Sequence, residues 1–329
     1  MSLPLTITGL RVDIGRSGPS VHVLRGVDLA LPDGQVSGLV GESGCGKSTT
    51  MLAVAGLLPP DARTLAGSIR LGEEELVGLS ERRWRGIRGA RIGVVFQNAR
   101  AALHPLRTVG DQLVRVHRRH FQSDRGAASA AVLEVLAASG FDRPREIVDR
   151  YPHQLSGGQC QRVMIGQALI AEPAIVLADE PTSGLDVTVQ EQVLETLLER
   201  VRDLGTSLLL ISHDITVIER ACDRVNVMYA GEVVESGARA AVLEHPAHPY
   251  TQALLAAVHP DSRRMPIVPG VVPDLRHEIH GCAFADRCPS VSEASRRSRP
   301  EPVAGPAGQQ VRCVLYAGDP VALPSRGAA

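Results

Sequence analysis

Lysine is almost absent from this chain. Of its 35 basic residues, 34 are arginine, and the single lysine is Lys47. Arginine therefore serves wherever a positive charge alone is needed, and Lys47 marks a position that requires a compact ammonium on a flexible stem. The same scarcity excludes a GTPase that reads guanine with an Asn-Lys-x-Asp motif, because no second lysine remains to build one.

Long apolar runs and an excess of one charge are also missing. The longest apolar runs, such as residues 208–211, fall far short of the ~20 residues that cross a bilayer. The first residues, MSLPLTITGL, lack a basic stretch followed by an apolar one, so we expect no secretory signal, a cytosolic chain and reduced cysteines. The net charge of -1 provides no broad positive field for nucleic acid. The arginine-rich stretches 81–91 and 115–125 do not have the aromatic interleaving of a stacking platform, since the first carries a single Trp84 and the second a single Phe121, so we interpret them as solvated faces or partner contacts.

The sequence contains enough hydrophobic residues to form the core of a packed α/β fold. The 329 residues are 44% hydrophobic, which suits one large or two unequal domains. Residues 36–40 predict a short apolar strand, and the fully apolar runs at residues 175–178 and 208–211 predict buried parallel strands. Residues 98–170 contain few strand signals and many helix formers, so they predict a helical region.

The composition and the hydrophobic periodicity of the chain change after residue 258. Proline and glycine become more frequent there, periodicity fades, and three of the six cysteines appear. We therefore predict a main domain over residues 1–258 and an irregular C-terminal extension over residues 259–329.

A glycine-rich loop, Gly-Glu-Ser-Gly-Cys-Gly-Lys-Ser, lies between an apolar strand and a helix-forming segment. Its glycines allow backbone N–H groups to turn inward around phosphate oxygens, and the following helix directs the positive end of its dipole at them. In this context Lys47 should reach the β- and γ-phosphates of ATP, and the Ser48 hydroxyl should coordinate Mg²⁺. The predicted ATP-binding residues here are Gly41, Glu42, Ser43, Gly44, Cys45, Gly46, Lys47, Ser48 and Thr49.

Two carboxylates follow the apolar run at residues 175–178. Asp179 and Glu180 stand at the carboxyl end of a predicted buried strand, where open α/β sheets bind their ligands. Asp179 is the predicted Mg²⁺ partner, and Glu180 is the predicted group that orients or deprotonates the attacking water. An acidic strand end alone is weak support, but together with the glycine-rich loop it predicts phosphoryl chemistry.

The segment Leu-Ser-Gly-Gly-Gln at residues 155–159 resembles the signature of ATP-binding cassette (ABC) ATPases. The resemblance extends over residues 3–258: Gln97 matches the Q-loop glutamine, and His213 matches the switch histidine. Residues 183–186 match the D-loop, with Gly184 where many relatives carry alanine. The resemblance implies a P-loop NTPase fold with a mixed sheet core, an antiparallel β subdomain and a helical subdomain that carries the signature.

The resemblance also implies a head-to-tail dimer that holds two ATP molecules between its subunits. The signature of one subunit would face the γ-phosphate bound by the loop of the other, and Gln97 would join the Mg²⁺ ligands. Many relatives stack adenine on an aromatic residue upstream of the loop; here only His22 offers a ring, and an ordinary exposed strand residue is an equal alternative. The further residues implied are Ser156, Gly157, Gly158, Gln159 and Asp186 for ATP, with Gln97, Glu180 and His213 in catalysis.

A subgroup is indicated by residues 245–255, HPAHPYTQALL. This segment resembles one found in importers for oligopeptides, dipeptides and nickel, as do residues 163–165 and 186–190. The resemblance implies peptide import, with nickel or a metal chelate as the alternative, at the cytoplasmic face of the cell membrane. Its implied partners are a second ATPase subunit, identical or related, two membrane-spanning subunits and an extracytoplasmic binding protein. A soluble ABC ATPase acting on ribosomes or DNA is the competing reading, but such proteins usually carry two cassettes.

The extension contains Cys282, Cys288 and Cys313. In the subgroup the tail often carries four cysteines, and some members hold an iron–sulfur cluster there. Here Ser295 stands at the expected third position, so three thiols remain where four usually ligate a cluster. A small tail with reduced cysteines is therefore the favoured reading.

Overall fold

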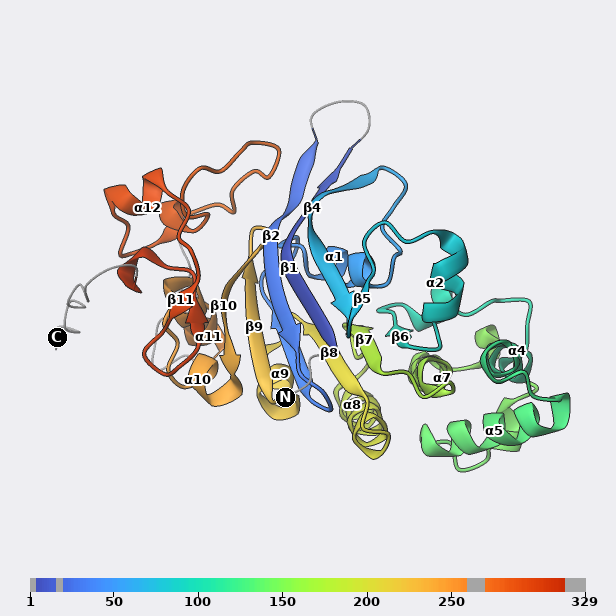
Figure 1. The fold of residues 1–329 in the computed structure, drawn as a ribbon. Coiled ribbons are helices and arrows are strands. Elements are labelled where there is room, and N and C mark those ends of the chain that lie inside the picture. Colours follow the sequence, from blue (N-terminus) through green and yellow to red (C-terminus); the bar gives the residue numbers. More distant parts are fainter. Residues whose placement is uncertain (1–3, 16–19, 259–269, 317–329) are drawn as a thin grey trace.

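The computed structural model describes residues 4–15, 20–258 and 270–316. Its central sheet holds five parallel strands (Figure 1). Three of them, β3, β7 and β8, are buried along their whole length, as the apolar runs predict. The five are β3 (Val36–Val40), β6 (Ile92–Val95), β7 (Ile175–Asp179), β8 (Ser207–Ser212) and β9 (Arg224–Tyr229). They lie in the order β9-β3-β8-β7-β6, so the strand that precedes the glycine-rich loop is central.

A second, antiparallel sheet covers one face of the first. Its order is β2-β1-β4-β5, built from β1 (Leu5–Ile14), β2 (Val21–Leu31), β4 (Ala62–Leu71) and β5 (Glu74–Glu75). The helix α1 (Lys47–Val54) and the short α2 (Glu81–Ile87) lie on the same side. One apolar cluster joins Leu39, Leu177 and Leu209 of the central strands to Leu10 and Met51.

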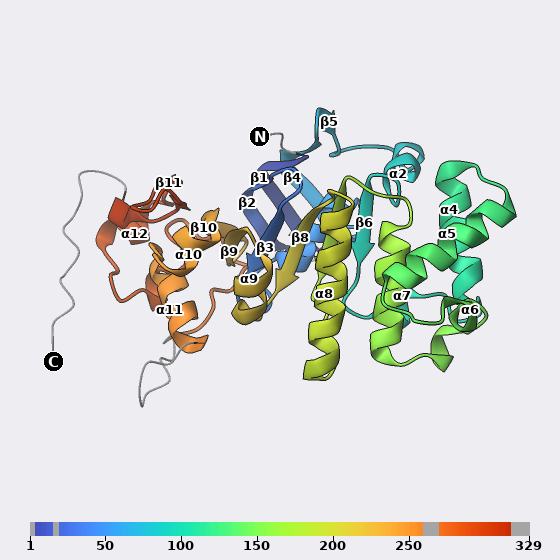
Figure 2. The same cartoon turned by 90° about the horizontal axis from the view of Figure 1, so that it is seen from below.

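Helices cover the opposite face of the central sheet (Figure 2). They are α7 (Gly157–Leu169), α8 (Val187–Asp203) and α9 (Ile215–Ala221). A second apolar cluster joins Val40, Ala178 and Leu210 to Val163 of α7 and Leu197 of α8. Successive side chains along a strand point to opposite faces, so each central strand contributes side chains to both clusters. Because both faces are buried, the sequences of these strands are almost continuously apolar.

The predicted helical region over residues 98–170 is confirmed. It contains α3 (Ala99–Ala102), α4 (Val109–Phe121), α5 (Arg125–Ala138), α6 (Pro144–Ile147) and the short η1 (Pro152–Gln154) ahead of α7. The Thr108 and Asp124 side chains cap α4 and α5 by accepting hydrogen bonds from the N–H groups of the first turns. This group lies at the opposite end of the molecule from the C-terminal extension (Figure 2).

The C-terminal part continues the central sheet. β10 (Glu232–Ala238) forms a hairpin with β9, and β12 (Gln310–Val311) pairs with β10 in an antiparallel arrangement. The strands β11 (Val303–Ala304) and β12 have two residues each, too short for a sequence pattern to reveal. The helical pieces are α10 (Arg239–Leu243), α11 (Pro249–Val258), η2 (Ala285–Arg287), α12 (Glu293–Arg297) and η3 (Val314–Tyr316). The domain boundary predicted after residue 258 coincides with the end of α11, and residues 259–269 lie outside the described ones.

Within the described ranges, no helix combines the length and the apolar character needed to cross a membrane.

Candidate functional site

Strand register brings three separate parts of the sequence to one edge of the central sheet. Val40 of β3 lies beside Ser212 of β8, and Asp179 of β7 lies beside Ile211 of β8. Because the strands are parallel, the residues that follow them emerge at the same edge. The glycine-rich loop, the carboxylates after β7 and the histidine after β8 therefore converge there.

Two glycines allow the loop to close tightly against β9 and β2. A Cβ atom on Gly41 would lie 2.1 Å from the Met228 carbonyl oxygen, and one on Gly46 would lie 3.0 Å from the Val23 carbonyl oxygen. Gly46 also adopts a φ of 108°, a left-handed conformation that favours glycine. It precedes α1, which begins at Lys47.

The single lysine lies at the centre of the loop. The Lys47 ammonium donates to the carbonyl oxygens of Gly41 at 2.7 Å and Glu42 at 3.0 Å. The side chain is only 6% exposed, so its stem is packed while its charge stays within the loop. The ammonium also donates to Cys45 Sγ at 3.7 Å. A buried cation held by two carbonyl oxygens and a thiol suits the attraction of a phosphate anion.

Two of the three predicted Mg²⁺ ligands, Ser48 and Asp179, are neighbours. Burial raises the pKa of the Asp179 carboxyl, a hydrogen bond from Ser48 opposes that shift, and the charge of Glu180 adds to it. A carboxylate and a hydroxyl are oxygen donors of the kind that Mg²⁺ takes from proteins, so these residues fit the ion.

Glu180 is held between Gln97 and His213. One carboxylate oxygen accepts from the Gln97 amide at 2.9 Å, and the other lies 2.9 Å from His213 Nδ1. An ionised carboxylate only accepts, so Nδ1 carries the proton in that pair. Glu180 has a φ of 44°, an uncommon conformation for a residue with a side chain, and its N–H donates to the Ile211 carbonyl at 3.0 Å. Strained backbone of this kind clusters at functional sites.

The signature segment stands apart from the loop of its own chain. Ser156 caps α7, accepting from the Gln159 N–H at 3.2 Å, while the Gln159 side chain accepts from the Ser156 N–H at 3.0 Å. Ser156 and Gly157 are exposed, and Gly158 is buried. In the described part of the chain, no hydrogen bond or ion pair joins residues 156–159 to residues 41–48.

The predicted D-loop residue Asp186 caps α8. Its carboxylate accepts from the Val189 N–H at 3.1 Å. Asp186 is exposed, and the next residue, Val187, is a 73% exposed apolar side chain. The signature and the D-loop are thus both presented on the surface.

His22 lies on β2 and contacts Asp13, with Nδ1 2.9 Å from a carboxylate oxygen. It lines a cavity of about 420 Å³ together with Leu24 of the same strand and with Ile279 and His280 of the extension. Leu24 in turn lies against Gly46 of the loop. The predicted adenine contact therefore borders a cavity next to the loop.

The three tail thiols do not fit a four-thiolate cluster. Cys282, Cys288, Cys313 and Ser295 line one enclosed cavity of about 10 Å³, which is room for about a single water molecule. The Ser295 hydroxyl is occupied as a donor to the Ser292 carbonyl at 2.7 Å. Burial raises the pKa of all three thiols, that of Cys313 to about 11, which favours the protonated form. Among the residues described, no group of three His, Cys, Asp or Glu side chains is arranged to hold a metal ion.

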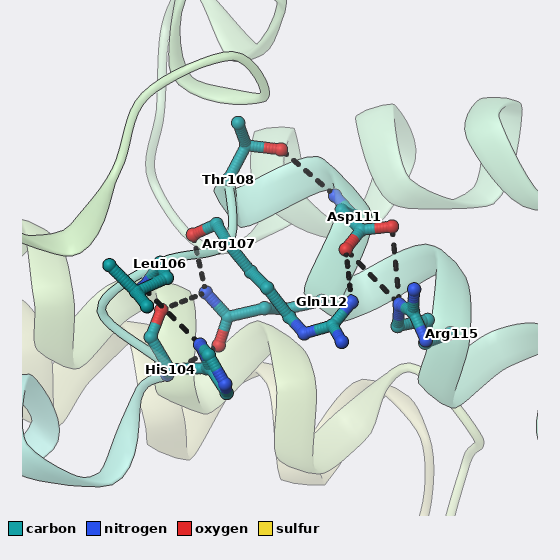
Figure 3. Close-up of polar contacts among 7 residues, drawn as sticks. All are labelled: His104, Leu106, Arg107, Thr108, Asp111, Gln112 and Arg115. Carbon is teal, nitrogen blue, oxygen red and sulfur yellow. Dashed lines mark hydrogen bonds and ion pairs between the residues drawn. The ribbon is translucent and has the colours of Figure 1, made fainter.

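The segment that follows Gln97 is held in a fixed shape (Figure 3). The buried Gln112 amide accepts from the His104 N–H at 2.8 Å and donates to the carbonyls of His104 at 3.2 Å and Arg107 at 3.0 Å. Asp111 binds the guanidinium groups of Arg107 and Arg115. Leu106 projects from this loop and is 82% exposed.

Three further residues contact the site: Ser183, which the sequence placed in the D-loop without a contact of its own, and Tyr250 and Arg287, which the sequence did not connect to the site. The Ser183 hydroxyl accepts from the Gln97 amide at 3.3 Å. The Tyr250 hydroxyl accepts from the Glu42 N–H at 2.9 Å, and Arg287 pairs with the Glu42 carboxylate. Tyr250 falls in the segment that resembles peptide and nickel importers, but nothing local connects that segment to the loop.

The raised pKa of Asp179 predicts that Asp179→Asn stabilises the ligand-free chain. A carboxyl whose pKa rises on folding costs stability above its unfolded pKa, and that cost vanishes at lower pH, where both states are protonated. In a chelating buffer at neutral pH, the thermal midpoint should rise by roughly 1–3 °C. The difference should shrink as the pH falls through the raised folded-state pKa toward about 4, and it should be largely lost below that value. The exposed Asp149→Asn serves as the control, and a midpoint lowered by Asp179→Asn would contradict the assignment.

Comparisons with known proteins agree with this geometry. A family model described as "ABC transporter" matches residues 24–183, and one described as "Oligopeptide/dipeptide transporter, C-terminal region" matches residues 234–294. The chain is 41% identical over 319 residues to the dipeptide transport ATP-binding protein DppD of Bacillus subtilis, covering 96% of this chain and 95% of that protein. It is 44% identical over 288 residues to the probable D,D-dipeptide transport ATP-binding protein DdpD of Escherichia coli, covering 86% and 88%.

A solved structure shares the same fold. The ATP-binding cassette MJ0796, described as a dimer in a post-hydrolysis state bound to ADP and phosphate, is 26% identical. It superposes with a TM-score of 0.64 over 71% of this chain and 98% of that one. The predicted P-loop ABC cassette fold is confirmed. The chain therefore belongs to the ATP-binding subunits of ABC transporters, in the group that carries the oligopeptide and dipeptide transporter C-terminal region.

Proposed function

We propose that this chain binds and hydrolyses ATP at the edge formed by β3, β7 and β8 and thereby powers import of dipeptides or oligopeptides. The observation that carries the proposal is Glu180, held between Gln97 and His213 beside the loop that contains Lys47. The curated relatives are dipeptide transport proteins, which favours peptides over nickel.

The phosphates of ATP would lie along the loop. Lys47 would turn its ammonium from the carbonyls of Gly41 and Glu42 toward the β- and γ-phosphates, where the charge is greater. Ser48, Asp179 and Gln97 would hold Mg²⁺, which when bound neutralises charge on the phosphate oxygens. His22 is the proposed neighbour of the adenine, because the cavity that it lines adjoins the loop.

Glu180 would orient the attacking water and accept its proton. Gln97 and His213 fix the two carboxylate oxygens, so the carboxylate needs little rearrangement when the water arrives. His213 is exposed, and in its doubly protonated form, with Nδ1–H on Glu180, its Nε2–H would donate toward the γ-phosphate as charge develops there. Catalysis would thus depend on positioning and charge, as in other phosphoryl transfers.

The ATP site would be completed by a second subunit. Ser156 and Gly157 expose a hydroxyl and N–H groups at the start of α7, where an anion is favoured. Val187 and Asp186 are exposed beside them, as expected of a surface that a partner covers. The dimeric MJ0796 cassette supports this arrangement, and either an identical or a related subunit could fill it.

The membrane-spanning partners would contact the segment after Gln97. Leu106 is a large apolar side chain held out on a braced loop, so it can enter a pocket without losing much conformational freedom. Such a contact would place the chain peripherally, on the cytoplasmic face of the membrane. An extracytoplasmic protein would deliver the peptide to the membrane subunits.

Glu180→Gln tests the catalytic assignment. The amide cannot take a proton from water, so ATP turnover should fall by about 10²- to 10⁴-fold. ATP affinity should stay within about threefold, because the phosphate-binding groups are unchanged. Turnover is measured by phosphate release and affinity by calorimetry. Glu195→Gln, on an exposed position of α8, is the control, and near-normal turnover in Glu180→Gln would reject the role.

Uptake of labelled dipeptide and of nickel tests the transport assignment. Cells whose own chromosomal copy is deleted should regain dipeptide uptake, and not nickel uptake, when this chain is supplied. Leu106→Asp should lower that uptake by at least about tenfold, because it places a charge in the proposed contact. The purified variant should still hydrolyse ATP at the normal rate.

Val271→Asp provides a matched control, because Val271 is 86% exposed and lies in the extension, away from the braced loop. Restored nickel uptake would redirect the proposal to metal import. Recovery of the native chain from ribosomes or DNA, with none at the membrane, would overturn it.

A further inference from the structure

The C-terminal extension reaches into the glycine-rich loop through Arg287. Its guanidinium donates to both carboxylate oxygens of Glu42, at 2.9 Å and 3.1 Å, across 245 residues of sequence. The Arg287 side chain is 7% exposed and that of Glu42 is 28% exposed. A two-pronged, nearly buried pair of this kind is strong and directional.

A second contact holds the same loop residue. The Tyr250 hydroxyl accepts from the Glu42 backbone N–H at 2.9 Å, and Tyr250 is fully buried at the start of α11. Arg287 also donates to the Tyr229 hydroxyl at 3.2 Å. Glu42 is therefore fixed at its backbone by α11 and at its side chain by the extension.

An aromatic cluster holds Arg287 in place. Phe284, one helical turn earlier in the extension, packs edge-on against Tyr229 with ring centroids 5.3 Å apart. It also packs against Tyr250 in a tilted arrangement, with ring centroids 5.4 Å apart. The Arg287 guanidinium carbon lies 5.7 Å from the Tyr229 ring centre and 5.8 Å from that of Phe284. The guanidinium thus arrives at the loop already oriented.

The charge of Glu42 matters because of where it lies. Its carbonyl is one of the two that hold the Lys47 ammonium, so any movement of Glu42 also moves the lysine. An unpaired carboxylate next to bound triphosphate would repel it, and in a partly buried site that repulsion is weakly screened. The ion pair with Arg287 holds Glu42 in place and balances its negative charge. It therefore prevents both the movement of Glu42 and the repulsion of the triphosphate.

We infer that Arg287 is a positioning residue for ATP binding: it neutralises and anchors Glu42, so that the C-terminal extension forms part of the nucleotide site. The inference rests on the proposed ATPase function. It assigns to the extension a role in ATP binding that is independent of any metal in the tail.

Arg287→Met tests this inference because it keeps an apolar stem and removes the charge. The KM for ATP should rise by about 10- to 100-fold, with a much smaller change in kcat. Arg287→Lys should recover part of the loss, because it restores charge without the two-pronged geometry. Arg296→Met, which removes an exposed ion pair to Asp286 in the same extension, should leave both constants unchanged.

The double variant Glu42→Gln/Arg287→Met distinguishes positioning from a structural role. Its KM should return to within about threefold of the wild-type value, because no unpaired carboxylate remains. A KM unaltered in Arg287→Met, or a double variant no better than Arg287→Met alone, would overturn the inference. Arg287→Gln is the second variant if Arg287→Met does not fold, because it also removes the charge and its KM should rise by a similar factor. Failure of the wild-type chain to hydrolyse ATP would instead reject the proposed function.

Discussion

Parallel pairing of β3 with β8, and of β8 with β7, fixes the distances on which the whole site depends. Val40 pairs with Ser212, and Asp179 pairs with Ile211, one residue before Ser212, so the loop, Glu180 and His213 emerge side by side. The strands are buried on both faces, between the antiparallel sheet and the helices α7 to α9. Packing on both faces therefore fixes the register of these strands. A one-residue slip of β7 would exchange the faces of its side chains and carry Glu180 away from Gln97.

Much of this site could be predicted from the sequence because its signals are local. Residues 41–48 combine glycines, a lysine and a serine within one turn between a strand and a helix, and Asp179 and Glu180 directly follow an apolar strand. The placement of Gln97 and His213 depended on the family resemblance, since a single glutamine or histidine at a strand end has no local signature. The model brings both to the Glu180 carboxylate.

The rest could not be predicted, because its contacts join distant segments. Arg287 and Glu42 are 245 residues apart in the sequence, and no pattern around either residue predicts their contact. The extension looks irregular in sequence, yet β12 adds to the central sheet through only two residues and Phe284 closes an aromatic cluster with Tyr229 and Tyr250. Such pairings depend on tertiary packing, which periodicity does not encode.

The central claim is that the loop requires lysine and that arginine cannot replace it. Lys47 reaches two carbonyls inside a tight loop and is almost fully buried, which leaves little room for the broader, planar guanidinium. The most direct measurement is ATP affinity and turnover in Lys47→Arg, in a chain that otherwise uses only arginine. We expect affinity to fall by about tenfold or more and turnover by about 100-fold. Full retention of both would contradict the account.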